Sequence, residues 1–341
     1  MGAGTTGPDG GTEALALDAV LGTLLAVLLL LAVKAAAEQL RRRRAGVAVL
    51  VVGAGPVGLT AALVAVRTGR VLKLTVQDAR ARGPLLGRPQ QIALDPRSVR
   101  FLRPLGVDFD NVEGCWRNGH FFTRVGVFQE HLLSLLERKG QRPGFRLLLG
   151  TKFTDDFMRK VVVPDWPKII VVADGSHGET CSVLGLSPDY VVESCNAYGA
   201  NATITRLDQR QIMKTIFHQA FNTYKMDIEP RVRDTAMPRV QCSRKLFEIV
   251  LSHRRATAAY IQGEGRVVTV EGEAARVLNF DTGSGVNLGL QGLESLDEFI
   301  CKIATAVDQS DILEALAAKI RHSKQVAEDF KRNGLLTTVF E

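Results

Sequence analysis

The sequence is poor in cysteine and histidine, and neither residue falls into a metal-binding or disulfide pattern. The five cysteines are odd in number and widely spaced, with no C-x-x-C pair: Cys115, Cys181, Cys195, Cys242 and Cys301. The six histidines show no paired ligand spacing. These gaps argue against a disulfide framework and a zinc site, and they suit a reducing compartment. We therefore predict that the chain has no metal site.

The chain also lacks a basic stripe, although its formal net charge is +7. Four of the positive charges form the block Arg41–Arg44, and the rest are spread thinly without interleaved aromatic residues. This pattern argues against a nucleic-acid partner, because the expected electrostatic footprint is missing. With 341 residues, 46% of them apolar, the chain is large enough for two domains or one large α/β domain.

The N-terminal region changes from polar to apolar. Residues 1–13 are glycine-rich and polar, and we expect them to be disordered. Residues 14–37 include the uncharged apolar run Ala19–Val33, and a membrane-spanning helix needs roughly 20 apolar residues. Because Arg41–Arg44 follow closely after this run, the positive-inside rule favours a single-pass signal anchor with the catalytic body in the cytosol.

Three other structures could account for this region: a cleaved signal peptide, a transit peptide and an ordinary buried helix. A cleaved signal peptide would find small residues in "KAAAEQ", but it should begin with positive charge. A transit peptide should be rich in arginine and poor in acids. Asp9, Glu13 and Asp18 come before or near the start of the apolar run, and no Lys or Arg does, which argues against both. An ordinary buried helix fits poorly with so apolar a run. We therefore predict a transmembrane anchor over 14–37.

A glycine-rich loop follows in "VLVVGAGPVGLTAAL". The apolar run Val47–Val52 predicts a strand buried on both faces, and Leu59–Arg67 continues as an apolar helix. Between them Gly53, Gly55 and Gly58 form G-x-G-x-x-G, with Pro56 and Val57 inside the motif. We expect Gly53 to permit the tight turn, Gly55 to let a pyrophosphate approach, and Gly58 to allow close packing of helix on strand. The motif predicts a bound dinucleotide, and the alternative is a purely structural turn.

An acidic residue stands at the expected distance after this loop. A second apolar run, Val71–Val76, leads to Asp78, close to the spacing of about 20 residues at which an acid holds the ribose hydroxyls of a dinucleotide. Arg80 follows in a D-x-R pattern.

Three later segments carry further candidates. The loop "GRPQQIALDPRSVRFLRPLGV" bears Arg88 and leads into an expected amphipathic helix that includes Leu94 and Leu105. The expected helix "GVFQEHLLSLLERKG" has Gln129 near its start. The strand Lys168–Val172 ends in Asp174-Gly175. Taken singly, these residues have ordinary alternatives: a surface arginine, a helix-capping glutamine and a turn.

A second glycine-rich stretch, "GEAARVLNFDTGSGVNLGL", follows the expected strand at 266–270. It begins with Gly272-Glu273 and continues through Gly285, Val286 and Asn287 into an expected helix. Backbone N–H groups at such a helix start attract negative charge, as they do at the first loop.

The order of these motifs resembles the flavoprotein aromatic-hydroxylase family, typified by para-hydroxybenzoate hydroxylase. The segment "RPQQIALDPRSVRFLRPLGV" is most similar to the monooxygenase domain of the MICAL actin-oxidising proteins. The resemblance covers roughly residues 47–330 and implies bound FAD, with NAD(P)H as a transient co-substrate.

The resemblance also implies roles for single residues. Arg88 would contact the flavin side of FAD, and Gln129 would lie along the ribityl chain and pyrophosphate. Asp174 and Gly175 would belong to the motif that handles FAD and NAD(P)H. Glu273 would accept a hydrogen bond from a ribityl hydroxyl, and the backbone of Gly285, Val286 and Asn287 would face the flavin's carbonyl edge.

The chain departs from the family pattern in several places. Glu273 replaces an aspartate, Arg276 replaces a frequent histidine, and Asn279-Phe280 stand where prolines are common. The segment available for a β-sheet substrate domain is short. We expect an FAD-binding domain in two parts, 45–193 and 265–341, around a shortened substrate region at 194–264.

The expected fold is therefore α/β: a Rossmann-type, glutathione-reductase-like FAD-binding domain with a reduced β-sheet insertion, preceded by one transmembrane helix. The expected function is a membrane-anchored FAD-dependent oxidoreductase, of the monooxygenase type that uses NAD(P)H and O2. The alternative is an inactive FAD-fold protein that serves as an interaction module at a membrane. The sequence names no catalytic residue, substrate or oligomeric state.

Overall fold

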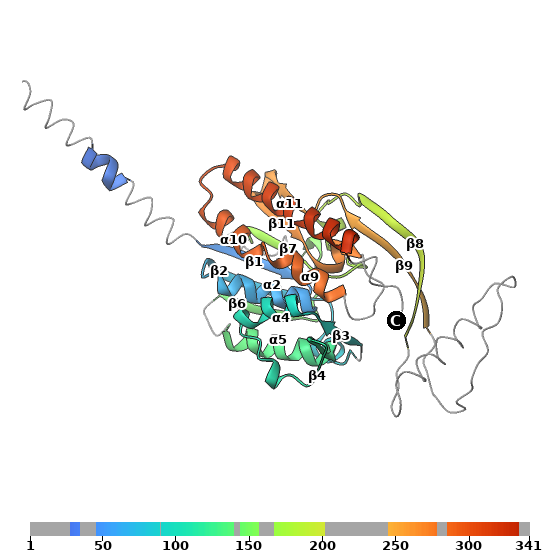
Figure 1. Ribbon diagram of the computed structural model, residues 1–341. Helices are drawn as coiled ribbons and strands as arrows, with labels where there is room; N and C mark the ends of the chain where they lie inside the picture. Colours follow the sequence, from blue (N-terminus) through green and yellow to red (C-terminus); the bar gives the residue numbers. More distant parts are fainter. Residues whose placement is uncertain are drawn as a thin grey trace, which may run out of the picture. The chain divides into compact units, whose positions relative to one another are not determined.

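Figure 1 shows the chain in a computed structural model that describes residues 28–34, 46–88, 90–139, 144–156, 167–201, 245–277 and 285–333. The chain divides into two compact units, Met1–Gly46 and Val47–Glu341. In the first unit, residues 28–34 form an exposed helix. No helix within the described residues is both long and apolar enough to span a bilayer. The predicted disordered segment at 1–13 and most of the predicted anchor at 14–37 lie outside those residues.

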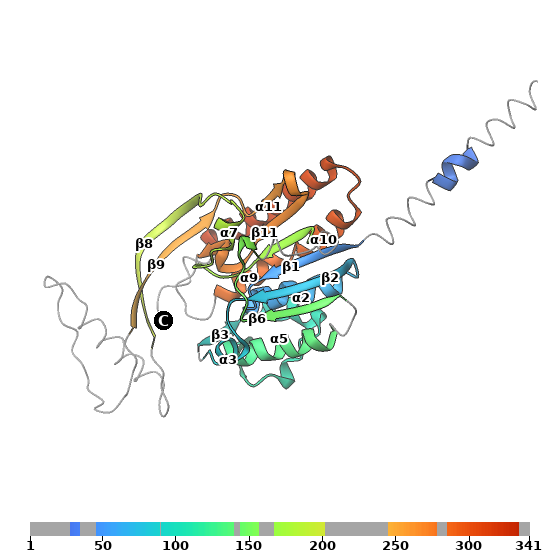
Figure 2. The same ribbon diagram turned by 180° about the vertical axis from the view of Figure 1, so that it is seen from behind.

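A six-stranded sheet forms the centre of the second unit, in the order β10-β11-β7-β1-β2-β6 (Figures 1 and 2). Its strands are β1 Val47–Val52, β2 Val71–Asp78, β6 Phe145–Leu149, β7 Ile169–Val172, β10 Ala258–Ile261 and β11 Arg266–Val270. Every pairing is parallel except that of β10 with β11, which is antiparallel. The predicted bounds of the first strand and of the strand at 266–270 are confirmed.

The central strand β1 is buried on both faces, as its unbroken apolar composition predicts. Val49 and Val51 join one hydrophobic cluster together with residues of the large helices, whereas Leu50 and Val52 join a second cluster on the opposite face. This second cluster includes Phe153 and residues at the start of α7. A strand with a polar face could not occupy this position without burying unpaired polar groups.

The helices of the second unit are α2 Pro56–Arg67, α3 Arg82–Leu86, α4 Pro96–Leu102, α5 Val125–Lys139, α7 Thr180–Val183, α9 Gly285–Leu293, α10 Leu296–Thr305 and α11 Gln309–Asn333. Short 3-10 turns occupy η1 Arg103–Leu105, η2 Phe109–Asn111, η4 Gln262–Glu264 and η5 Gly272–Ala274. Helix α2 packs against β1 and is flanked by α5, α9 and α10.

Two small antiparallel sheets complete the described fold. One contains β3 Gln91–Leu94, β5 His120–Arg124 and β4 Cys115–Arg117, and the other contains β12 Arg276–Val277, β9 Lys245–Arg254 and β8 Tyr190–Asn201.

These elements correct two expectations from the sequence. Leu94 lies in strand β3 and Leu105 in a 3-10 turn, so the expected amphipathic helix is confined to α4. Pro96 explains why the helix does not start earlier, because proline is tolerated in the first turn of a helix but not in its interior. Strand β10 pairs with β11 in the central sheet, so the second part of the α/β domain begins before residue 265. Most of the expected shortened substrate region at 194–264 lies outside the described residues, which leave out 202–244.

The strand order creates a switch point at β1. From β1 the chain builds β2 and β6 on one side, and it later returns to build β7 and β11 on the other. In an open parallel sheet, ligands bind in the crevice that such a reversal leaves beyond the carboxyl ends of the strands. A ligand site is therefore expected among the residues that follow the five parallel strands.

Candidate functional site

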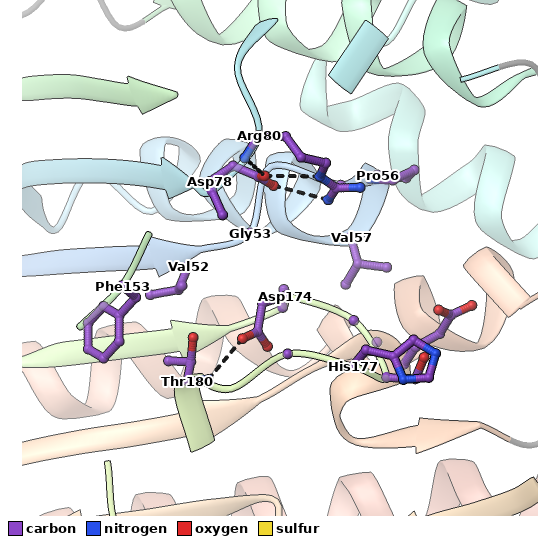
Figure 3. A pocket seen from close by; sticks show the side chains of 18 of the residues that line it. Val52, Gly53, Pro56, Val57, Asp78, Arg80, Phe153, Asp174, His177 and Thr180 are labelled. Atoms are coloured by element: carbon purple, nitrogen blue, oxygen red, sulfur yellow. Dashed lines mark hydrogen bonds and ion pairs between the residues drawn. The ribbon is translucent and has the colours of Figure 1, made fainter. Parts of the chain in front are cut away.

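A cavity of about 480 Å³ lies at the carboxyl ends of the five parallel strands (Figure 3). It is lined by Val52, Gly53, Gly55, Pro56, Val57, Asp78, Ala79, Arg80, Arg88, Val125, Thr151, Lys152, Phe153, Ala173, Asp174, Gly175, Ser176, His177, Gly178, Glu179, Thr180, Gly272, Glu273, Gly285 and Val286. In the view of Figure 3, Phe153 lies on the left and His177 on the right, while the Asp78 carboxylate points toward Arg80 and the Asp174 carboxylate toward Thr180. The volume falls in the usual range for small-molecule sites, about 300–1,000 Å³.

The glycine loop between β1 and α2 has the geometry that the motif predicts. Gly53 has a φ of +107°, and a Cβ there would lie 2.2 Å from the carbonyl oxygen of Ala173. A Cβ at Gly58 would lie 1.9 Å from the carbonyl oxygen of Gly53, so this glycine permits the close approach of helix to loop. Gly58 does not line the cavity. The close packing expected of Gly58 is therefore with the loop residue Gly53, directly after β1.

The start of α2 faces the cavity as a potential anion site. Gly55 is the N-cap residue, Pro56 opens the helix, and no acidic residue stands in the first turn. A Cβ at Gly55 would meet nothing within 4 Å, so the backbone is open to a ligand on this side. Unpaired N–H groups and the positive end of the helix dipole favour a phosphate group here.

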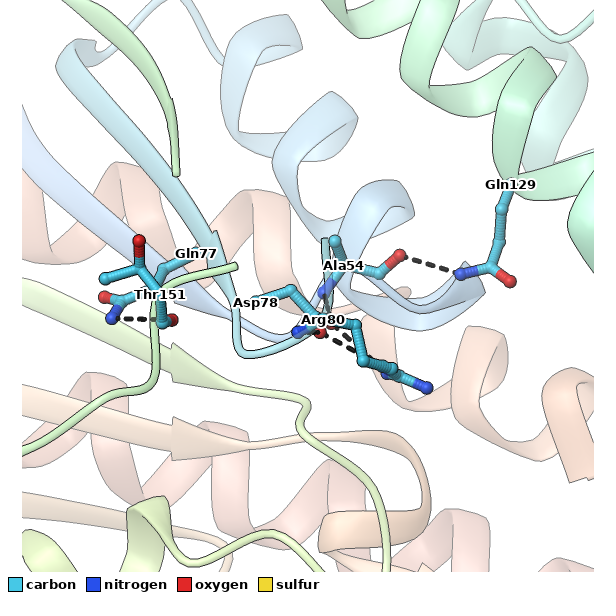
Figure 4. A network of polar contacts seen from close by, with 6 residues as sticks. All are labelled: Ala54, Gln77, Asp78, Arg80, Gln129 and Thr151. Atoms are coloured by element: carbon cyan, nitrogen blue, oxygen red, sulfur yellow. Dashed lines mark hydrogen bonds and ion pairs between the residues drawn. The ribbon is translucent and has the colours of Figure 1, made fainter. Parts of the chain in front are cut away.

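Asp78 ties the end of β2 to the glycine loop (Figure 4). Its Oδ2 accepts a hydrogen bond from the Ala54 N–H at 2.7 Å, and its Oδ1 accepts from the Arg80 N–H at 2.8 Å and from Arg80 Nε at 3.1 Å. Burial alone would raise the pKa of Asp78, but the hydrogen bonds from Arg80 and Ala54 prevail and the pKa is lowered. Asp78 is therefore a charged acceptor at neutral pH, and it shapes the loop as well as lining the cavity.

Arg88 brings a second guanidinium to the cavity. Burial lowers the pKa of Arg88 and nearby Arg80 lowers it further, whereas Glu273 and Asp78 raise it. An arginine stays charged in spite of such shifts. The cavity therefore places two cations near two carboxylates, although these residues come from three separate parts of the sequence.

Asp174 organises the loop that follows β7. Its Oδ2 accepts a hydrogen bond from the Thr180 N–H at 3.1 Å, and a Cβ at Gly178 would lie 2.0 Å from its Cγ. Gly175 has a φ of +89°, a conformation that favours glycine. The Asp-Gly pair thus folds the segment 174–180 back along the cavity wall, which this segment lines over its whole length.

The second glycine stretch lines the far part of the cavity. Gly272 has a φ of +62°, and a Cβ at Gly289 would lie 2.5 Å from Cγ2 of Val57, so α9 closely approaches the start of α2. Gly285 and Val286, in the first turn of α9, line the cavity beside Glu273. The Glu273 Oε1 lies 3.4 Å from the position of a Cβ at Gly285, which places this carboxylate against the start of α9. The predicted loop Asn279-Phe280 lies outside the described residues.

Two candidate ligand residues stand behind the cavity wall. Gln129 is fully buried and donates from Nε2 to the Ala54 carbonyl at 3.0 Å, so it supports the glycine loop from behind (Figure 4). Asn287 donates from Nδ2 to the Ala93 carbonyl at 2.7 Å and accepts at Oδ1 from the Asp95 N–H at 3.1 Å. Neither residue lines the cavity, and both side chains support neighbouring loops. The expected contact of the Asn287 backbone with the flavin stays a prediction.

The sequence pattern missed the wall formed by Thr151, Lys152 and Phe153. These residues follow β6, and Gln77 holds them by donating from Nε2 to the Thr151 carbonyl at 3.1 Å. The loop residues His177 and Glu179 were likewise missed. The largely apolar segment Phe145–Leu149, followed by Gly150, was the available signal for a strand whose exit loop borders the site.

The residues present fit an elongated dinucleotide better than a metal ion. Among the described residues, no group of His, Cys, Asp or Glu could hold a metal. Two helix N-termini, those of α2 and α9, instead meet one cavity. A Cβ at Gly55 would meet nothing within 4 Å, and one at Gly285 would meet only the Glu273 Oε1 at 3.4 Å. This arrangement suits a ligand with phosphate or carbonyl oxygens at two separate points.

Comparison with known proteins supports this fold. No protein-family model and no curated protein matches the chain in sequence. The solved p-nitrophenol 4-monooxygenase from Pseudomonas putida is similar over 84% of this chain and 88% of its own, at 16% identity and a TM-score of 0.55. A 2-methyl-3-hydroxypyridine-5-carboxylic acid oxygenase is similar over 86% and 93%, at 13% identity and a TM-score of 0.55.

A third similar structure was solved with its ligands. The flavin-dependent monooxygenase PieE, in complex with FAD and substrate, matches 84% of this chain and 63% of its own, at 14% identity and a TM-score of 0.53. At such low identity these likenesses establish the fold alone. The chain has the α/β fold of solved monooxygenases.

Proposed function

We propose that the cavity binds FAD and that the chain is an FAD-dependent oxidoreductase of the monooxygenase type. The observation that carries this proposal is the meeting of two helix N-termini, those of α2 and α9, each with a glycine in the cavity wall, at the switch point of the sheet. A dinucleotide with a pyrophosphate at one point and a polar ring edge at another is the ligand that such a cavity suits.

The residues that would hold FAD divide between the two ends of the cavity. Gly55, Pro56 and Val57 would receive the pyrophosphate at the start of α2, and Asp78 would bind the ribose. Glu273, with the backbone of Gly285 and Val286, would bind at the flavin end. When bound, the flavin supplies the electron transfer and the oxygen chemistry, and the protein supplies binding, orientation and electrostatics.

The protein's own residues determine how the cofactor would be held. The positive end of α9 would favour negative charge on the flavin, whereas the Glu273 carboxylate beside Gly285 would oppose it. Arg88 would partly offset Glu273, because the two groups interact electrostatically across the cavity. The chain would therefore set the flavin's electronic properties by a balance of charges of opposite sign.

The finer features of the proposal rest on the sequence. The apolar run near the N-terminus favours attachment to a membrane, and the order of motifs favours NAD(P)H as reductant. The MICAL-like segment around Arg88 favours a MICAL-type monooxygenase. The alternative is an inactive interaction module, and the placement of Glu273 against α9 is the observation that favours it, because a resident carboxylate competes with the flavin for the helix start.

Reduction by a nicotinamide tests the activity. The purified chain, loaded with FAD, is mixed with NADPH or NADH without oxygen, and the visible flavin absorbance is followed. The proposal predicts that at least one nicotinamide bleaches the flavin and that added O2 restores the colour. Bound FAD that neither nicotinamide reduces would support the inactive module and contradict the monooxygenase.

A further inference from the structure

A buried cluster of charges lies behind the flavin end of the cavity. Glu271 directly follows β11, Arg276 begins β12, and Lys319 belongs to α11. Their exposed fractions are 0%, 3% and 2%, and none of them lines the cavity. Charged residues are almost never so fully buried without a specific arrangement of partners.

The Lys319 ammonium uses all of its hydrogen-bonding capacity. It donates to Glu271 Oε1 at 2.7 Å, to the Gly292 carbonyl at 2.7 Å and to Ser295 Oγ at 3.2 Å. An ammonium has three donors, so no N–H group is left over. Through this one atom α11 is joined to the end of β11, to α9 and to the turn that precedes α10.

Arg276 adds a second set of links between the same elements. Its guanidinium donates from Nη2 to Ser323 Oγ on α11 and from Nη1 to the Leu288 carbonyl of α9 at 3.4 Å. A Cβ at Gly292 would lie 2.5 Å from Arg276 Nη1 and 3.1 Å from Glu271 Oε2. Glycine at 292 therefore lets α9 lie against both charged groups at once.

Stability alone does not account for these charges. Taking ions out of water costs several kcal/mol each, and apolar residues of similar volume often stabilise a protein equally well. Two buried cations face one carboxylate, and Glu271 Oε2 has no hydrogen-bond partner. What the cluster provides is a fixed geometry, because hydrogen bonds are directional and apolar contacts are not.

The segments that this cluster holds in place are the ones that line the far end of the cavity. Glu271 and Arg276 stand at the two ends of the short segment Gly272–Ala275, whose Gly272 and Glu273 line the cavity. The same cluster holds the carbonyls of Leu288 and Gly292 in α9, whose first residues Gly285 and Val286 line it too.

We propose that Glu271, Lys319 and Arg276 are positioning residues that hold the segment Gly272–Ala275 and helix α9 against α11, so that the flavin end of the cavity is formed before the ligand binds. The identity of the ligand rests on the function proposed above. Pre-formation reduces the ordering that binding requires, and it therefore raises affinity without any contact between the cluster and the ligand.

The test removes the central ion pair from the full chain. The double variant Glu271→Gln/Lys319→Met deletes one charge of each sign and keeps side chains of similar volume. Its control, Arg67→Gln/Asp297→Asn, deletes an exposed pair joined at 2.9 Å between α2 and α10. Hydrogen exchange of the flavin-free protein, thermal unfolding and FAD affinity are measured for both variants and the parent.

The proposal predicts a local effect. Exchange should accelerate about tenfold or more in residues 271–277 and 285–293 but not in β1 or β7, and FAD affinity should fall about tenfold or more. The control should match the parent. Unchanged exchange in the two segments, or equal acceleration throughout the sheet, would overturn the proposal.

Two complications of this test, a variant that does not fold and a parent that binds no FAD, have separate outcomes. If the double variant fails to fold, Glu271→Gln alone is used, because it leaves Lys319 and Arg276 buried without their counter-charge. The same local acceleration is expected, and its absence counts against the cluster. If the parent itself binds no FAD, the proposed function fails, whereas the exchange measurement still decides the positioning role.

Discussion

The carboxylate of Asp78 accepts a hydrogen bond from the backbone N–H of Ala54 at 2.7 Å. This contact joins the end of β2 to the glycine loop that follows β1, on the side where the cavity opens. It makes the acid at the end of β2 part of the loop's own structure. The Asp78 side chain therefore has two roles: it holds the loop at the start of α2, and it lines the cavity where a ligand would bind.

Replacement of Asp78 should weaken both the loop and the ligand site. Asp78→Ala removes a charged acceptor that is 4% exposed, and hydrogen bonds to charged groups contribute about 1.5–3 kcal/mol. We expect the free energy of unfolding, measured with denaturant, to fall by this amount. We also expect the affinity for FAD to fall about tenfold or more. The exposed Asp110→Ala is the control, and equal behaviour of the two variants would contradict this role.

The same residue predicts a pH dependence. Because its folded-state pKa is lowered, Asp78 contributes stability above its ordinary pKa of about 4, and this contribution is lost as the pH falls through the lowered value. The stability difference between the parent and Asp78→Asn should therefore be large at neutral pH and shrink in acid. Urea unfolding of the two proteins at neutral pH and in acid measures this stability difference. A difference that does not change with pH would argue against a charged, hydrogen-bonded Asp78.

Two glycines of the first loop should behave differently. A methyl group at Gly58 would meet the Gly53 carbonyl at 1.9 Å, whereas at Gly55 it would meet no atom within 4 Å. Overpacking costs about 1–3 kcal/mol or more, and backbone cannot yield as a side chain can. Gly58→Ala should lose thermal stability, while Gly55→Ala should keep it and bind FAD less tightly. Equal thermal midpoints would show that the helix does not pack as described.

A larger side chain at the start of α9 should block the flavin end. Gly285 lines the cavity, and Gly285→Val would place its methyl groups beside Glu273 and in the path of the ligand. We expect a folded protein that no longer retains FAD through gel filtration. Gly263→Val, at an open position in η4, is the matched control. Normal FAD retention by Gly285→Val would reduce this stretch to a structural role.

The cysteines report on the packing beneath the cavity. Burial raises the pKa of the Cys181 thiol to about 11, so it stays protonated and shielded at mildly alkaline pH. Cys115 is exposed. Brief treatment of the native protein with iodoacetamide near pH 8, followed by peptide mass analysis, should therefore label Cys115 and spare Cys181. Rapid labelling of both would mean that the segment after β7 does not cover the sheet as described.

Local patterns were enough to predict the first loop and much of the second. The strand Val47–Val52 and the tight turn at Gly53 follow from neighbours in the chain, because steric and hydrogen-bonding rules act over a few residues. The same rules placed Gly285 at the start of a helix.

Long-range pairing decided what the sequence left open. Thr151 reaches the cavity because β6 pairs with β2, and no local pattern specifies that partner. Lys319 resembles an ordinary surface charge of a long helix until the fold brings it to Glu271. Gln129 was assigned to the ligand, but its Nε2 donates to the Ala54 carbonyl behind the cavity wall, a contact that depends on how α5 packs against the glycine loop.

Uptake of FAD by the purified chain tests the central claim most directly. The protein is freed of ligand, incubated with FAD, separated from excess cofactor and examined by visible absorbance, with circular dichroism as the check of folding. We predict a yellow protein that retains stoichiometric FAD. A folded but colourless protein that takes up no added FAD would contradict the account.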